Sequence, residues 1–270
     1  MTDEIPDAPS DTVILNVTPE GVAMVTLNRP EVHNAFNIEL VQRLSEIFDD
    51  LEDQDGIRIV LIDGVGPSFS AGGDLKEMQR ADGQSESEMR GDFADFATML
   101  LRLRGLPQPT VALVHGSAIA GGLGLVAACD IAIATADAAF ALSEVRLGII
   151  PAMIAPYVVE AMGPRAARRY MLTGERFGAE EALRLGLVTS VVADRNALAA
   201  ESERIVSLLL QGGPEALAAA KELLDLVTYM PIDEDLNEET VGMTAERRVS
   251  AEGKEGSIAF FEKRKPGWAG

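Results

Sequence analysis

Hydrophobic and polar positions follow two different periods along this chain, and each period predicts a different kind of element. Short apolar and β-branched runs bounded by turn residues predict buried strands, at residues 13–15, 22–27, 57–62, 110–114 and 131–134. From Asn37 to about Asp53 the apolar residues instead recur every three to four positions. This spacing predicts an amphipathic helix with Asn37 as its N-cap. Further helices are predicted at 88–104 and, as a short apolar one, at 121–128.

The pattern changes after about Pro151, where helical spacing begins to dominate. One short strand is predicted at 188–192, and about the last 75 residues are almost wholly helical in pattern. The sequence therefore predicts an α/β core of strand-strand-helix units at 12–195 and a helical region at 196–270. We expect residues 1–11 to form a loose leader and the polar segment 80–87 to be a mobile loop.

Composition and charge narrow the classes of partner. The 270 residues are 47% hydrophobic and 24% charged, which is typical of globular proteins. Twenty-three basic against 43 acidic residues give a formal net charge of −20. Nucleic acid is an unfavourable partner for such a chain, because binding its phosphates needs a basic surface. An anionic small molecule needs only a few local cations or backbone N–H groups, so it stays compatible with this charge.

The cysteine count, the N-terminal sequence and the length of the apolar stretches bear on the cellular location of the protein. Cys129 is the only cysteine, which excludes a disulfide framework and fits a reducing interior. The acidic N-terminus resembles neither a secretory signal nor a transit peptide. No apolar stretch approaches the roughly 18 residues of a membrane span. We therefore expect a cytoplasmic protein that does not enter membranes.

Several common catalytic motifs are absent from the sequence. It contains no dinucleotide-binding G-x-G-x-x-G after a strand, no P-loop and no G-x-S-x-G elbow. The only histidines are His33, in a polar loop, and His115, at the end of an apolar strand. Neither has a metal-ligand neighbour at usable spacing, so we expect no metal site.

Two glycine-rich segments follow predicted strands, and each leads toward a helix. They span 68–76 and 115–124. Taken alone, each segment is most simply an ordinary tight turn. Two such turns after core strands make a shared site more credible, because their bare backbone N–H groups can face an anion or an oxyanion.

A third segment, 140–151, places Glu144 among apolar residues. A carboxylate there either pairs with a cation such as Arg146 or has a raised pKa and transfers protons. The residues alone leave these two interpretations about equal.

These three segments, in this order, resemble the enoyl-CoA hydratase/isomerase (crotonase) superfamily. The block formed by 121–126 and 142–148 is similar to methylglutaconyl-CoA-type hydratases of bacteria. The likeness covers roughly residues 13–268, and the ordered set of motifs is specific for the superfamily. Further matches are Asn28-Arg29-Pro30, Asn34-Ala35-Phe36-Asn37, Ala127-Ala128-Cys129-Asp130-Ile131, Leu172-Thr173-Gly174-Glu175, the segment 182–188 and the segment 255–264.

The resemblance implies an architecture and an assembly. The expected fold is a crotonase-like spiral of strand-strand-helix units with a helical C-terminal trimerisation region. Homotrimers are expected, alone or paired into hexamers. Val241, Met243 and the pair Phe260-Phe261 should then be buried between subunits, because an exposed apolar patch is a liability for a monomer.

The resemblance also implies a CoA thioester as substrate, with coenzyme A entering as part of it and no separate cofactor. By position, the backbone N–H groups of Gly73 and Gly121 would hold the thioester oxygen and stabilise an enolate. Glu144 would act as the acid/base. The residues implied to bind the CoA part are Ala71, Gly73, Asp74, Leu75, Lys76 and Gly121, with Phe260 and Lys263 reaching the CoA of a neighbouring subunit.

One departure from the family pattern affects the mechanism. Typical family hydratases carry two acid/base glutamates, and the position of the first is here Gly124. Four interpretations stay open: hydration of a 2-enoyl-CoA by Glu144 alone, isomerisation of a 3-enoyl-CoA to a 2-enoyl-CoA, a non-catalytic acyl-CoA-binding paralogue, and a feruloyl-type hydratase-lyase.

We favour hydration on family likeness, although the chemistry of a single carboxylate favours isomerisation. The segment 152–156 also departs from the family's glycine-rich pattern, and we expect it to alter the acyl pocket. The sequence does not specify the acyl chain.

Overall fold

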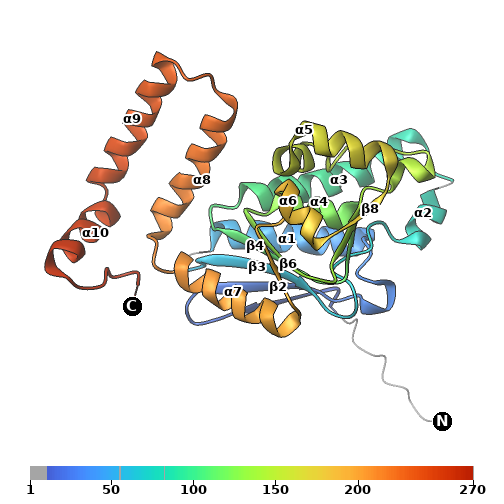
Figure 1. The fold of residues 1–270 in the computed structure, drawn as a ribbon, viewed down its shortest axis with the longest axis horizontal. Coiled ribbons are helices and arrows are strands. Elements are labelled where there is room, and N and C mark those ends of the chain that lie inside the picture. Colours follow the sequence, from blue (N-terminus) through green and yellow to red (C-terminus); the bar gives the residue numbers. More distant parts are fainter. Residues whose placement is uncertain (1–10, 55, 82, 270) are drawn as a thin grey trace, which may run out of the picture.

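The computed structural model describes residues 11–54, 56–81 and 83–269. The leader predicted at 1–11 therefore lies, apart from Asp11, outside the described residues. A six-stranded sheet forms the centre of the fold, with strand order β1-β2-β3-β4-β6-β9 (Figure 1). Within this sheet, as far as the described residues go, β1 and β2 are antiparallel and the other pairs are parallel. The strands are β1 (Val13–Val17), β2 (Val22–Leu27), β3 (Ile59–Gly64), β4 (Thr110–Val114), β6 (Ile131–Thr135) and β9 (Ser190–Val192).

A second, smaller sheet has the order β5-β7-β8. Its members are three-residue strands, β5 (Ser117–Ile119), β7 (Ala139–Ala141) and β8 (Arg176–Gly178). β5 and β7 directly follow β4 and β6 in the chain. Each pair of strands thus turns from the large sheet into the small one, which is the strand-strand-helix unit that the sequence predicts.

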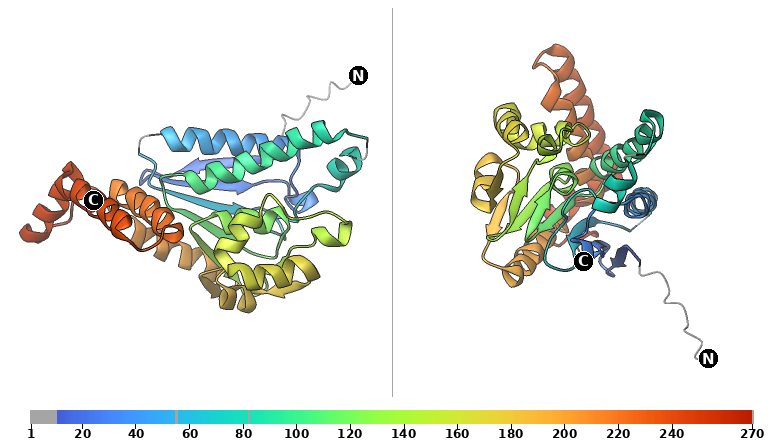
Figure 2. Two further views of the ribbon diagram at one scale, coloured as in Figure 1. Left: turned by 90° about the horizontal axis from the view of Figure 1, so that it is seen from above. Right: turned by 90° about the vertical axis from the view of Figure 1, so that its right-hand side faces the viewer.

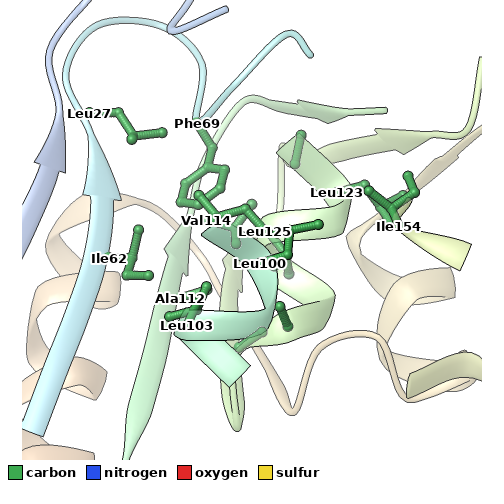
Figure 3. Close-up of a cluster of buried hydrophobic side chains, with 14 of the residues drawn as sticks. Leu27, Ile62, Phe69, Leu100, Leu103, Ala112, Val114, Leu123, Leu125 and Ile154 are labelled. Atoms are coloured by element: carbon green, nitrogen blue, oxygen red, sulfur yellow. The ribbon is translucent and has the colours of Figure 1, made fainter. Parts of the chain in front are cut away.

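Helices cover both faces of the large sheet (Figure 2). Their apolar sides enclose the main core, of which Figure 3 shows the part where Ile62 and Val114 from the sheet meet Leu100 and Leu123 from the helices. The opposite face is covered by α7, whose Leu198 joins a smaller cluster with strand residues. The helices of this part are α1 (Ile38–Asp53), α2 (Leu75–Ala81), α3 (Glu86–Gly105), α4 (Gly121–Ala128), α5 (Ala155–Thr173), α6 (Ala179–Leu185) and α7 (Arg195–Leu209), with 3-10 turns at Pro30–Val32 (η1) and Glu144–Leu147 (η2).

The α/β class and the main elements predicted from the pattern are confirmed, with shifted ends. Asn37 caps α1, as predicted, by accepting from the amide of Leu40. α3 begins two residues before the predicted start, because Ser85 and Glu88 form a capping box. The segment 80–87 is not one continuous loop. α2 ends at Ala81 and α3 begins at Glu86, so the described connection between them is residues 83–85.

Three further helices, α8 (Pro214–Tyr229), α9 (Glu234–Val249) and α10 (Ala251–Glu262), extend away from the sheet (Figure 1 and Figure 2, left). We call this unit, residues 214–262, the C-terminal arm. The boundary predicted at 195/196 falls at the start of α7, which packs on β6 and β9. The helices that leave the sheet begin later, at Pro214.

Polar contacts hold the arm to the rest of the chain. The ammonium group of Lys221 in α8 contacts a carboxylate oxygen of Asp130 at 2.7 Å and donates to the carbonyls of Leu106 and Gln108. Arg58 donates to the carbonyls of Gly212 and Trp268, at 2.8 and 3.0 Å. These contacts fix the root of α8 and the last described residues against the core.

Candidate active site

The glycine-rich segment after β3 runs alongside the segment that contains β5. Ser70 pairs in parallel with Ala118, and its N–H and C=O bond to Ser117 and Ile119, both at 3.0 Å. Three residues further along each segment lie Gly73 and Gly121. Because parallel segments advance together, this pairing brings the two predicted oxyanion-binding residues to neighbouring positions.

Glycine is required where these two segments touch. A Cβ on Gly72 would lie 2.9 Å from the carbonyl oxygen of Ile119, and one on Gly122 would lie 2.6 Å from that of Ser70. Gly72 also has a φ of +89°, which glycine adopts without strain. Gly72 and Gly122 therefore let the two backbones approach closely.

The amide groups of Gly73 and Gly121 are both without an acceptor within the described part of the chain. Phe36 bonds to the two residues flanking Gly73, so the N–H of Gly73 points away from that bridge. Gly121 is the first residue of α4, where N–H groups lack an intrahelical partner and the helix dipole favours negative charge. Two such donors can stabilise an oxyanion.

Ala120, immediately before this donor, has the backbone angles φ 50° and ψ −118°. An alanine in this region is strained by roughly 1–3 kcal/mol, and such strain persists only where surrounding contacts enforce it. The enforcing contact is the bond from the Ala120 amide to the carbonyl of Ala141 at 2.8 Å. The amide of Gly121 is thus held in a fixed direction.

Glu144 reaches the same place through the small sheet. β5 pairs with β7 so that Ile119 lies opposite Ala141. Gly121 follows Ile119 by two residues, and Glu144 follows Ala141 by three. The parallel pairing therefore delivers the carboxylate and the helix amide to the same edge of the small sheet.

The surroundings of Glu144 shift the pKa of its carboxyl group. Its Oε2 atom is buried and has no hydrogen-bond partner. Burial raises the pKa of this carboxyl above its ordinary value of 4.5, against a smaller opposing contribution from a backbone hydrogen bond. No cation lies within salt-bridge distance of it among the described residues. Of the two interpretations of Glu144 left open by the sequence, the geometry fits the proton-transferring one.

The side chain of Ile154, just before α5, covers Gly124. A Cβ on Gly124 would lie 2.1 Å from Cγ2 and 2.7 Å from Cβ of Ile154. Ile154 is only 3% exposed and belongs to the main core. Figure 3 shows it beside Leu123 of α4. A side chain at position 124 is therefore excluded as long as Ile154 stays in place.

The remaining residues expected to bind CoA occupy different settings. Ala71, Leu75 and Lys76 are exposed near the start of α2. Asp74 is only 4% exposed, and its carboxylate bonds to Arg29 at 2.9 Å and to the Lys76 amide at 2.8 Å. Although burial alone would raise the pKa of Asp74, these bonds lower it on balance. The side chain of Asp74 thus fixes the loop.

Phe260 and Lys263 are not brought to this site within one chain. They lie at the end of α10 on the C-terminal arm, and α2 lies at the opposite end of the molecule (Figure 1). Both side chains are exposed.

The sequence interpretation missed two residues that hold the site together. Asn34 is fully buried, and its Nδ2 group donates to the carbonyls of Val65, Ser68 and Phe69. Arg29 joins Asp74 to the carbonyl of Ala35. Both residues belong to motifs on which the family resemblance rests. That membership is the sequence signal that could have identified them.

Other titratable groups in the described residues do not form a second centre. His115 is buried, and burial, with a smaller contribution from Arg195, lowers its pKa to about 4. Burial also raises the pKa of the Cys129 thiol. In the described ranges no three His, Cys, Asp or Glu side chains are arranged to hold a metal ion. No helix among these residues combines the length and apolarity needed to cross a membrane.

The chain matches a known protein family over almost its whole length. The profile of the family described as enoyl-CoA hydratase/isomerase matches residues 17–270. The chain belongs to this family. The crotonase fold expected from the sequence is confirmed by solved structures, including their helical C-terminal region.

Three relatives cover nearly the whole chain. An enoyl-CoA hydratase from Shewanella pealeana superposes with a TM-score of 0.92 at 39% identity, covering 95% of this chain and 96% of its own. Pseudomonas aeruginosa AtuE gives 0.92 at 40% identity, covering 96% and 100%. Carnitinyl-CoA dehydratase of Escherichia coli O157:H7 is 32% identical over 95% of this chain and 98% of its own length. Membership of this family therefore indicates hydratase or isomerase chemistry on acyl-CoA thioesters at this site.

Proposed function

We propose that this crotonase-family protein is an enoyl-CoA hydratase that uses Glu144 as its single acid/base. The observation that supports the proposal is the pairing of Ser70 with Ala118 and of Ile119 with Ala141. It sets the segments that lead to Gly73, Gly121 and Glu144 side by side. The two amide N–H groups would donate hydrogen bonds to the thioester carbonyl oxygen of a 2-enoyl-CoA. Coenzyme A enters as part of this substrate, and no further cofactor is needed.

The steps follow from the properties of these groups. The Glu144 carboxylate takes a proton from a water molecule as the water oxygen bonds to C3 of the substrate. The electron pair of the C2–C3 double bond moves toward the thioester oxygen, where the Gly73 and Gly121 amides stabilise the enolate. Glu144 then returns the proton to C2, so that one water has been added and the carboxylate is regenerated.

A second candidate is a 3-enoyl-CoA to 2-enoyl-CoA isomerase. It is favoured by the exclusion of a second carboxylate at Gly124, since moving one proton from C2 to C4 needs a single base. The same amides would hold the dienolate between the two proton transfers.

The deciding experiment is mass spectrometry of the products from a panel of 2-enoyl- and 3-enoyl-CoA thioesters. A gain of one water supports the hydratase. An unchanged mass with a displaced double bond supports the isomerase instead. Tight acyl-CoA binding without any turnover would overturn both and leave a non-catalytic binding protein.

We further propose that the active form is a homotrimer or a pair of trimers in the cytoplasm. Phe260 and Phe261 are 78% and 79% exposed on the arm, beside an apolar groove of about 730 Å³ between its helices. Burial of these side chains against another copy would remove this surface from water. It would also carry Phe260 and Lys263 to a neighbouring subunit's CoA.

A further inference from the structure

Ile154 and Gly124 form a single packing unit at the site, although they are thirty positions apart in sequence. The space that any side chain at 124 would need is filled by the Cγ2 methyl of Ile154. Their two elements, α4 and the start of α5, are in extensive contact. At position 124 the surface of α4 is therefore covered by the side chain of Ile154, because Gly124 has no side chain of its own.

This surface lies close to the reacting carbons of a bound thioester. Gly121 and Gly124 are three residues apart on α4, so they share a face and are separated by about 5–6 Å. The Gly121 amide would hold the thioester oxygen. C2 and C3 of the acyl group are only two and three bonds from that oxygen. The Ile154 side chain over Gly124 is only 3% exposed, so its hydrocarbon closes this face of α4 beside the place that C2 and C3 would take.

The 3-10 turn η2 supplies the polar group of the site, the carboxylate of Glu144. Glu144 in η2 and Ile154 are the two ends of one chain segment, and η2 itself contacts α5. The segment thus supplies one proton-transferring carboxylate and one apolar wall.

We infer that Ile154 is a specificity-determining residue. Its side chain forms an apolar wall over Gly124, and this wall selects acyl-CoA thioesters that are apolar and unbranched at C3. This inference rests on the proposed function, since it assumes that the thioester lies on Gly121. A methyl branch at C3 facing this wall meets Ile154, and a hydroxyl there finds no partner on it.

The test measures binding, so that it is independent of turnover. Dissociation constants are determined by calorimetry for butyryl-CoA, isovaleryl-CoA and 3-hydroxybutyryl-CoA. The native protein should bind butyryl-CoA most tightly. Ile154→Ala removes three carbons and should shift the isovaleryl/butyryl affinity ratio by about tenfold toward the branched ligand, since one methyl in an apolar pocket discriminates by about 10–200-fold.

A matched control separates selection from general loosening of the core. Val158→Ala truncates a fully buried residue one turn further along α5. It should lower stability without changing the affinity ratio. An unchanged ratio in Ile154→Ala, or an equal shift in Val158→Ala, would overturn the inference. Failure of the proposed function would instead appear as native protein that binds acyl-CoA and turns over no enoyl-CoA.

A second pair of variants covers the case in which Ile154→Ala does not fold. Gly124→Ala alone should be strongly destabilised, because its Cβ overlaps Ile154. Gly124→Ala combined with Ile154→Gly removes both Ile154 atoms that the new Cβ would overlap, Cγ2 at 2.1 Å and Cβ at 2.7 Å. It should recover stability and prefer butyryl-CoA over isovaleryl-CoA again, because the new methyl refills the space. A double variant as unstable as Gly124→Ala, or one that keeps the ratio of Ile154→Ala, contradicts the inference.

Discussion

Glu144 is the residue whose ionisation controls the proposed reaction. Its pKa is raised by burial, so the carboxylate needed as a base is present above that pKa and is lost as the pH falls through it. We expect kcat/KM to decline on the acid side at a pH clearly above 4.5. Glu144→Gln should lower kcat by about 10²–10⁴-fold with little change in CoA affinity. Full activity of this variant would refute the mechanism.

The same residue should lower the stability of the fold at neutral pH. Because its folded pKa lies above the unfolded value, Glu144 contributes its stabilisation below pH 4.5, and this is lost as the pH rises through the folded pKa. Glu144→Gln should therefore unfold at higher urea concentration than the native protein at pH 7, and the gain should vanish near pH 4. A gain that is independent of pH would point to packing instead.

Asn34 is expected to matter through position, since its side chain ties the loop that carries Gly73 to the amide of Arg29. Asn34→Ala would leave the carbonyls of Val65, Ser68 and Phe69 without this donor. A buried group left unsatisfied costs about 1–3 kcal/mol, so we expect a loss of that size in the free energy of unfolding and a lower kcat. Asn237→Ala, at an exposed position on α9, is the control and should change neither.

At the scale of elements, local pattern was sufficient for the long segments and for the short α4 and β9, but it missed other short elements. The helix at α1 was predictable because its period and its cap agree. The three-residue strands β5, β7 and β8 are too short to show a period, and α2 begins directly after a glycine-rich turn.

Contacts between distant residues were also beyond sequence reasoning. The pairing of Asp74 with Arg29 spans 45 positions, and the contact of Ile154 with Gly124 depends on how α5 packs on α4. The sequence could therefore indicate that 152–156 alters the pocket, but not in which direction. Gly73, Gly121 and Glu144 could be proposed from the sequence because each lies in one of the three ordered segments that resemble the family.

α8 is attached to the core largely through polar groups, and Lys221 is central among them. Lys221→Ala removes the partner of Asp130 and of two carbonyls. Breaking a buried pair from one side costs about 3–5 kcal/mol, and this pair is partly exposed, so we expect about 2 kcal/mol by urea unfolding. Lys254→Ala on the exposed side of α10 should have no effect. Equal losses in the two variants would contradict an anchoring role.

At the scale of the whole molecule, we expect the arm to determine assembly. We expect sedimentation to give a trimer or a hexamer at micromolar concentration. Phe261→Asp places a charge on the exposed apolar surface of α10 and should release monomers. Those monomers should also bind CoA more weakly, because Phe260 and Lys263 would no longer reach a neighbour. A native protein that sediments as a monomer would exclude this assembly.

The attachment of the last described residues gives the protein a natural optical reporter. The only tryptophan, Trp268, donates through its indole N–H to the carbonyl of Gln211, and its ring packs on Gly256 of α10. Its fluorescence therefore senses the root of the arm, whereas far-ultraviolet circular dichroism senses every helix. In Lys221→Ala the emission should shift to longer wavelength before the dichroism signal is lost. Coincident transitions would mean that arm and core unfold as a single cooperative unit.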